Sequence, residues 1–218
     1  MDPETDGVDP ANPLSPEQTD PVEASAPAPA PAPTDPGTPT QGAPRQATLP
    51  QPTITTGGST TVSAVAGGAS AQINGGTETA AYALVSYRVA TGAMTATTEF
   101  TVNPAPGAAF EYHLIGTGSG YVSRYLRLIH EPGSSTLGAA SAAGVVECGA
   151  LPSGQPTTIT LAFDGNARTF DVLIAGARSA CTDLPAKTSG PVNGVRLSDS
   201  TVQGYGGRVD FSNLALFY

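Results

Sequence analysis

The chain has 218 residues, with 18 acidic and nine basic side chains and a formal net charge of −9. This charge excludes the basic footprint of a nucleic-acid-binding protein, and no apolar run reaches the length of about 18 residues needed for a transmembrane helix. Two cysteines are too few for a disulfide-dense miniprotein or a four-cysteine zinc site. A soluble, β-rich protein remains.

Residues 1–52 are predicted to be a disordered, acidic linker rich in proline and alanine. The first fifty residues hold 13 of the 21 prolines and eight of the 18 acidic side chains, with Arg45 as their single base. Between Pro27 and Pro33, proline at every second position removes backbone donors and favours an extended polyproline-II conformation. No hydrophobic export signal precedes the linker. We therefore expect that Met1 replaces a removed signal and that the protein is secreted or anchored at the cell surface.

Residues 53–218 are predicted to form one domain of short antiparallel strands. Apolar and polar side chains alternate in four segments, 80–90, 95–102, 110–115 and 121–131. This period of two indicates half-buried strands. The polar or amphipathic side chains that the alternation directs outward are Arg88, Glu99, Glu111, His113, Tyr121, Tyr125 and Arg127.

A hairpin and a final strand complete the expected domain. Two alternating runs within Thr157–Gly176 flank Asp164-Gly165-Asn166, a turn sequence because glycine and asparagine accept positive φ angles. Residues 206–218 read as a long apolar strand, which we expect inside a sheet. The segments together predict an all-β fold of two packed sheets.

Three sequence segments carry a resemblance to a known family. An aromatic strand at 82–89, the hairpin ITLAFDGNARTFDVLIAG and the final GYGGRVDFSNLALF resemble the concanavalin-like jelly roll of laminin-G-type and legume-lectin-type domains, many of them bacterial. In those domains a Val-acidic-Phe-x-Asn-Leu strand closes the sheet, as Val209–Leu214 would here. The resemblance covers about 55–218 and implies a two-sheet antiparallel jelly roll that binds carbohydrate.

The sequence departs from that family in two ways. It has no tryptophan near the first aromatic strand, and no acidic cluster matches the family's calcium sites. We therefore expect no cofactor. Calcium bound by Asp164 and Asn166 is the alternative to a simple turn at those two residues.

Cys148 and Cys181 are the only cysteines. In an exported protein we expect them to form one disulfide across the 157–176 hairpin. The alternative is a thiol nucleophile or a pair of metal ligands, but neither His113 nor His130 stands at a motif spacing from them.

The outward polar residues predict a ligand-binding surface of the sheet. Its expected members are Arg88, Glu99, Glu111, His113, Tyr121, Tyr125, Arg127 and Tyr205. The tyrosines would stack on sugar rings. Our first hypothesis is a non-catalytic extracellular or cell-surface recognition domain for carbohydrate or a cell-envelope polymer.

Three alternatives stay open. In the first, the protein is a self-associating structural subunit of an extracellular layer or filament. In the second, it is a polysaccharide-cleaving enzyme. This enzyme would be either a glycosidase with Glu99 and Glu111 as its acid pair or a lyase using His113, Tyr125 and Arg127. In the third, the polar residues form only a solvated sheet face with cross-strand ion pairs and no binding site.

Overall fold

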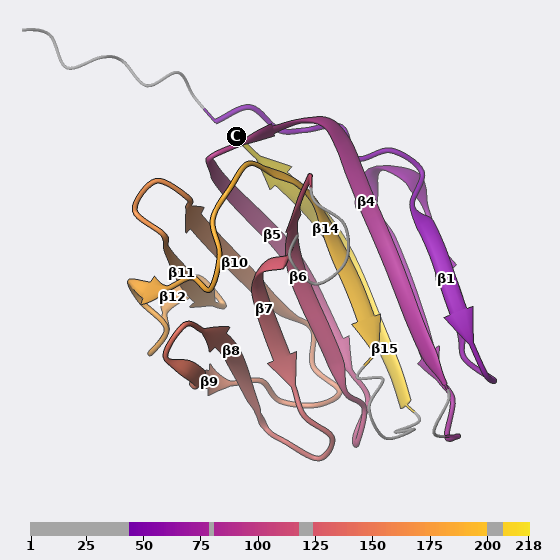
Figure 1. The fold of residues 1–218 in the computed structure, drawn as a ribbon. Coiled ribbons are helices and arrows are strands. Elements are labelled where there is room, and N and C mark those ends of the chain that lie inside the picture. Colours follow the sequence, from indigo (N-terminus) through magenta and orange to yellow (C-terminus); the bar gives the residue numbers. More distant parts are fainter. Residues whose placement is uncertain (1–43, 79–80, 118–123, 200–206) are drawn as a thin grey trace, which may run out of the picture. The chain divides into compact units, whose positions relative to one another are not determined.

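The computed structural model describes residues 44–78, 81–117, 124–199 and 207–218 (Figure 1). These residues form two antiparallel sheets and one short 3-10 turn, η1 (Ala66–Gly68). The predicted all-β, two-sheet jelly roll is thereby confirmed. No helix in the described part of the chain is long and apolar enough to cross a membrane.

The first sheet has seven strands in the order β1-β4-β14-β6-β7-β8-β9. Every neighbouring pair in it is antiparallel. Because β14 inserts between β4 and β6, residues about 80 to 110 positions apart in sequence become neighbours. Its strands are β1 (Thr53–Gly57), β4 (Tyr82–Ala93), β14 (Val192–Asp199), β6 (Phe110–Gly116), β7 (Arg124–His130), β8 (Thr136–Ser141) and β9 (Gly144–Ala150).

The second sheet has eight strands in the order β12-β11-β10-β5-β15-β3-β2, with β13 also paired to β11. The final strand, β15, lies between β5 and β3, inside the sheet as the sequence predicted. Its strands are β2 (Thr61–Ala64), β3 (Ser70–Gly75), β5 (Thr95–Pro104), β10 (Thr157–Asp164), β11 (Thr169–Ile174), β12 (Ala177–Arg178), β13 (Leu184–Pro185) and β15 (Gly207–Phe217).

Aromatic side chains from both sheets meet in the core between them. Phe100 of β5 stacks on Tyr112 of β6 with ring centroids 4.1 Å apart. Phe211 of β15 meets Phe110 of β6 edge to face at 5.5 Å. The Tyr112 hydroxyl hydrogen-bonds the Thr98 hydroxyl at 2.6 Å, and burial raises the pKa of Tyr112 well above its ordinary value. A buried polar group that has a partner avoids the cost of an unmade hydrogen bond.

The chain joins the sandwich before residue 53, where the sequence placed the domain boundary. The Arg45 N–H donates to the Tyr218 carbonyl at 2.9 Å, and the Ala47 N–H donates to the Leu216 carbonyl at 2.7 Å. Leu49 is buried in the core cluster. The prolines at 50 and 52 interrupt any strand pattern there, so these contacts leave no periodic signal in the sequence.

The predicted β10–β11 hairpin is present, but its turn works differently from the expectation. The Asp164 Oδ1 accepts hydrogen bonds from the backbone N–H groups of Asn166 at 2.8 Å and Ala167 at 3.0 Å. The positive φ of 59° falls on Arg168, while Gly165 and Asn166 keep negative values. Side-chain capping by the aspartate therefore organises the turn, and this accounts for Asp164 without a bound ion.

The predicted disulfide between Cys148 and Cys181 is formed. Cys148 lies in β9 of the seven-stranded sheet, whereas Cys181 lies between β12 and β13, both paired to β11 of the other sheet. The Ala180 N–H donates to the Cys148 carbonyl at 3.0 Å beside the bond. The disulfide thus joins the two sheets at one edge of the sandwich.

Removing the disulfide should destabilise the domain without changing its fold. For a loop closed by residues 33 positions apart, the chain-entropy model gives a loss of about 3–4 kcal/mol of unfolding free energy. The measurement is guanidinium unfolding of the Cys148→Ala/Cys181→Ala variant, with the oxidised wild type as control. An unchanged unfolding midpoint would contradict a stabilising role.

Candidate functional site

One row of side chains crosses all seven strands on the face turned away from the core. We call this set the outer row. Strand register places its members directly opposite one another, and none of them belongs to the core cluster. They are Thr53 (β1), Ser86 (β4), Arg196 (β14), His113 (β6), Arg127 (β7), Ala140 (β8) and Val145 (β9).

Glu111 connects two members of the outer row. Its Oε2 lies 3.0 Å from His113 Nε2, and its Oε1 lies 3.1 Å from Arg127 Nη2. The His113 side chain is only 1% exposed, while that of Arg127 is 41% exposed. One carboxylate therefore holds a buried imidazole and a solvent-accessible guanidinium side by side on neighbouring strands.

Two further arginines lie on the same face. Arg196 Nε donates to Ser86 Oγ at 3.1 Å, and Arg88 Nη1 donates to the Gly116 carbonyl at 2.8 Å. These contacts hold both side chains along the sheet surface. The centre of this face is thus polar and rich in arginine.

A shallow hollow of about 210 Å³ lies on the same face at β7, β8 and β9, beside Arg127. It combines apolar surface with hydroxyl and carboxylate groups, so it offers both hydrogen-bond partners and a surface for a ring. Its lining residues are Ile129, Glu131, Ser134, Thr136, Gly138, Val145 and Glu147.

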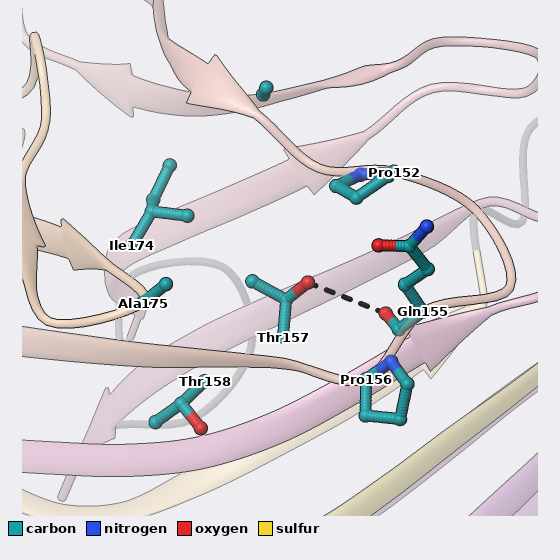
Figure 2. Close-up of a pocket in the computed structure, with 8 residues that line it drawn as sticks. Pro152, Gln155, Pro156, Thr157, Thr158, Ile174 and Ala175 are labelled. Atoms are coloured by element: carbon teal, nitrogen blue, oxygen red, sulfur yellow. Dashed lines mark hydrogen bonds between the residues drawn. The ribbon is translucent and has the colours of Figure 1, made fainter.

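A second, larger hollow lies where the β9–β10 connection meets the start of β10 and the end of β11 (Figure 2). Its volume is about 560 Å³. Thr157 Oγ1 donates to the Gln155 carbonyl at 3.3 Å within it. The eight residues that line it include no titratable side chain, and for this reason we do not place the chemistry of the protein here.

Tyr125 faces the core, and its prediction as an outward stacking residue is wrong. The pairing of β6 with β7 shifts between Leu114 and Ile115, so β7 carries an extra residue at this point. Such a bulge breaks the two-residue alternation. Tyr125 is 7% exposed and stacks on Phe163 with ring centroids 5.8 Å apart. A Cβ added to Gly116 would overlap its hydroxyl.

The predicted acid pair of a glycosidase is not assembled. Glu99 lies on β5 of the eight-stranded sheet, where Thr160 Oγ1 donates to it at 3.4 Å, whereas Glu111 lies on β6 of the other sheet. Stacked sheets are about 10 Å apart, and these two side chains point away from each other on the opposite outer faces. Glycosidase acid pairs are separated by roughly 5–9.5 Å.

The predicted lyase set is also divided. His113 and Arg127 share the outer face, but Tyr125 lies on the core side of the same sheet. The two remaining tyrosines of the predicted site, Tyr121 and Tyr205, fall outside the described residues. Among the described residues, no group of three or more histidine, cysteine or acidic side chains is placed to hold a metal ion.

Two polar residues of β14, Arg196 and Asp199, were not among the predicted site residues, and only Arg196 lies on the outer face. The segment 192–199 carries the signal for Arg196, because Val195 and Leu197 alternate with it. Asp199 is buried, and its Oδ1 accepts a hydrogen bond from the Ala83 N–H at 2.6 Å. Burial is the main cause that raises the pKa of Asp199, and the nearby Glu111 charge adds to it.

Comparisons with solved structures found likenesses at low sequence identity. A chain described as a sialidase superposes with a TM-score of 0.61 at 11% identity, over 76% of this chain and 17% of that one. The Emp47p carbohydrate recognition domain gives a TM-score of 0.46 at 14% identity, over 75% and 87%. The botulinum neurotoxin serotype G binding domain gives 0.45 at 11%, over 76% and 43%.

The superposition on the sialidase chain supports the two-sheet jelly-roll fold and nothing finer. The chain spans less than a fifth of the sialidase chain that it matches. No family model matches the sequence, and no curated protein matches it significantly.

Replacing Glu111 should cost more stability than replacing Glu99. Glu111→Ala removes an acceptor from buried His113 and from Arg127, and the loss of one partner of a buried hydrogen bond costs about 1–3 kcal/mol. Glu99 is exposed, so Glu99→Ala should change stability by less than about 0.5 kcal/mol. Urea unfolding at neutral pH measures both. Equal effects would show that the Glu111 cluster contributes nothing to stability.

Asp199 should make the domain more stable as the pH falls. Its pKa is raised in the folded state, so between the folded and unfolded pKa values the folded state binds more protons, and stability increases toward lower pH. Asp199→Asn retains an acceptor for Ala83 and does not titrate. We expect its stability advantage over the wild type to shrink between pH 7 and pH 4, as measured by urea unfolding. A difference independent of pH would contradict this assignment.

Proposed function

We propose that the chain is a non-catalytic extracellular or cell-surface recognition domain that binds carbohydrate or another cell-envelope polymer on the outer row. The observation that carries the proposal is the Glu111–His113–Arg127 cluster beside the 210 Å³ hollow. Sites for small polar ligands combine apolar surface with a few oriented polar groups. Ile129 and Val145 supply the apolar surface here, and Ser134 and Arg127 supply the polar groups.

The dimensions of the site favour a polymer segment over a deeply enclosed ligand. Pockets that enclose drug-sized molecules measure about 300–1,000 Å³, and this hollow is smaller. It therefore suits one sugar ring, while neighbouring rings extend along the outer row. Contact with one side of a ligand predicts modest affinity.

The pairing of Glu111 supports binding over cleavage. Both of its carboxylate oxygens already accept contacts, from His113 and from Arg127. A general base must reach the proton that it removes, and this carboxylate is directed toward its own neighbours. Among the described residues, Glu99 is not placed to complete an acid pair with it.

The structural-subunit alternative rests on a separate observation at the sheet edge. β1 ends the seven-stranded sheet and carries no charged side chain within Thr53–Gly57. Its Ile54 is a large exposed hydrophobic residue. Uncharged edge strands are templates for pairing with another chain. Light scattering across a concentration series distinguishes this alternative, because it predicts oligomers whose mass rises with concentration.

Binding can be tested by native electrophoresis in gels that contain purified neutral or acidic polysaccharides. We expect at least one polymer to slow the wild-type protein. Val145→Trp should weaken that retardation roughly fivefold, equivalent to about 1 kcal/mol, because Val145 lies at the end of the outer row and lines the hollow. Val145 is 67% exposed, so the substitution should leave the fold intact.

Val65→Trp is the matched control, because Val65 is also exposed but lies outside the seven-stranded sheet, between β2 and η1. It should be slowed as strongly as the wild type. Two results contradict the proposal: a wild-type protein that no polymer slows, or equal losses in the two tryptophan variants.

A further inference from the structure

We infer that the outer row selects carbohydrate that carries negatively charged groups, and that Arg127 binds the carboxylate or sulfate of such a sugar. This inference rests on the proposed function and names its ligand class. It starts from the distribution of charge. The chain as a whole is strongly acidic, yet one face gathers Arg88, Arg127 and Arg196.

The strands of the sheet concentrate these arginines. β4, β14 and β7 each contribute one of them, and Glu111 of β6 supplies a carboxylate among them. Only nine basic side chains exist in the chain, so three on one face are a considerable share. The centre of the face therefore carries an excess of positive charge, which attracts an anionic ligand against the overall charge of the protein.

Arg127 has hydrogen-bond donors left for a ligand. A guanidinium carries five N–H donors, and Glu111 Oε1 contacts Nη2. The Nε of Arg127 is buried and has no hydrogen-bond partner among the described residues. The side chain as a whole is 41% exposed, so a ligand anion would reach its other N–H groups from solvent, and not the buried Nε. Arginine also binds carboxylates and sulfates through two donors at once.

Glu111 positions Arg127 for this contact. The ion pair fixes one end of the guanidinium, and His113 holds the other oxygen of the same carboxylate in place. A guanidinium that is already oriented loses less side-chain entropy when it binds. Glu111 is thus a positioning residue, and Arg127 makes the contact.

The neighbouring hollow indicates that charged and neutral groups alternate in the ligand. Glu131 and Glu147 line the hollow. In the strand register, Ile129 of β7 lies opposite Gly138 of β8, and Gly138 lies opposite Glu147 of β9. Glu147 is therefore two strands away from β7. Neighbouring strands are about 4.8 Å apart, so Glu147 lies on the order of 10 Å to the side of β7. A second anionic group there would be repelled, whereas the hydroxyls of a neutral ring would donate to these carboxylates. This argues against a uniformly charged chain such as a polyphosphate.

The test compares hyaluronan, in which a carboxylate-bearing ring alternates with a neutral ring, with the same polymer after methyl esterification of its carboxylates. Dextran sulfate and dextran form the corresponding pair for sulfate. Affinity electrophoresis should show at least about tenfold tighter binding, equivalent to about 1.4 kcal/mol, to the charged member of one pair. The preference should decrease as salt increases. The pair that shows it identifies the anion.

Arg127→Ala should abolish the preference for the charged polymer, and Arg127→Lys should retain part of it because the charge remains without the planar guanidinium. Arg208→Ala is the matched control. Arg208 is 57% exposed and pairs with Asp210 on β15 of the other sheet, so its loss should leave the preference unchanged. Urea unfolding checks that each variant is folded.

The outcomes separate this inference from the proposed function. Equal binding to the charged and neutral members of both pairs overturns the inference but leaves carbohydrate recognition intact. Binding to neutral polysaccharides alone, with none to hyaluronan or dextran sulfate, also overturns the inference and leaves carbohydrate recognition intact. Equal losses in the Arg127 and Arg208 variants would show general charge attraction and overturn the assignment to Arg127. A protein that binds no polysaccharide overturns both proposals.

Discussion

The packing of aromatic rings between the two sheets is the constraint on which the rest of the structure depends. Phe100 and Tyr112 stack across the interface, and Phe110 and Phe211 meet edge to face beside them. Since successive side chains of a strand point to opposite faces, the inward position of Tyr112 requires that Glu111 and His113 point outward. The polar outer row is therefore a consequence of how the core is filled.

Strand order then decides which outward side chains meet. β14 and β6 are far apart in sequence, but their pairing brings Arg196 opposite His113. The pairing of β6 with β7 brings Arg127 to the other side of the same histidine. The disulfide acts at a different place, since it joins β9 to the eight-stranded sheet at the edge of the sandwich. Hydrophobic packing and one covalent bond together hold the sheet that carries the site.

Alternation in the sequence predicts well which face of its sheet a side chain is on, but it does not predict which strands lie next to each other. It correctly directs Glu111, His113 and Arg127 away from the core, because a strand's period is local. It fails for Tyr125, where a bulge inserts one residue and reverses the face. It also fails to separate Glu99 from Glu111, because both are outward residues and only the strand order shows that they belong to different sheets. The missing information in each case is long-range pairing.

The pairing of Glu111 links the two functional alternatives that the sequence left open. A carboxylate that serves as an acid or base in glycoside cleavage must exchange protons with the substrate. Here the same carboxylate contacts His113 and Arg127, which direct it along the sheet. In the proposed function, that engagement gives Glu111 a positioning role, because its ion pair holds one end of the Arg127 guanidinium. In our proposal, the contact that argues against catalysis is also the one that orients Arg127 for an anionic sugar.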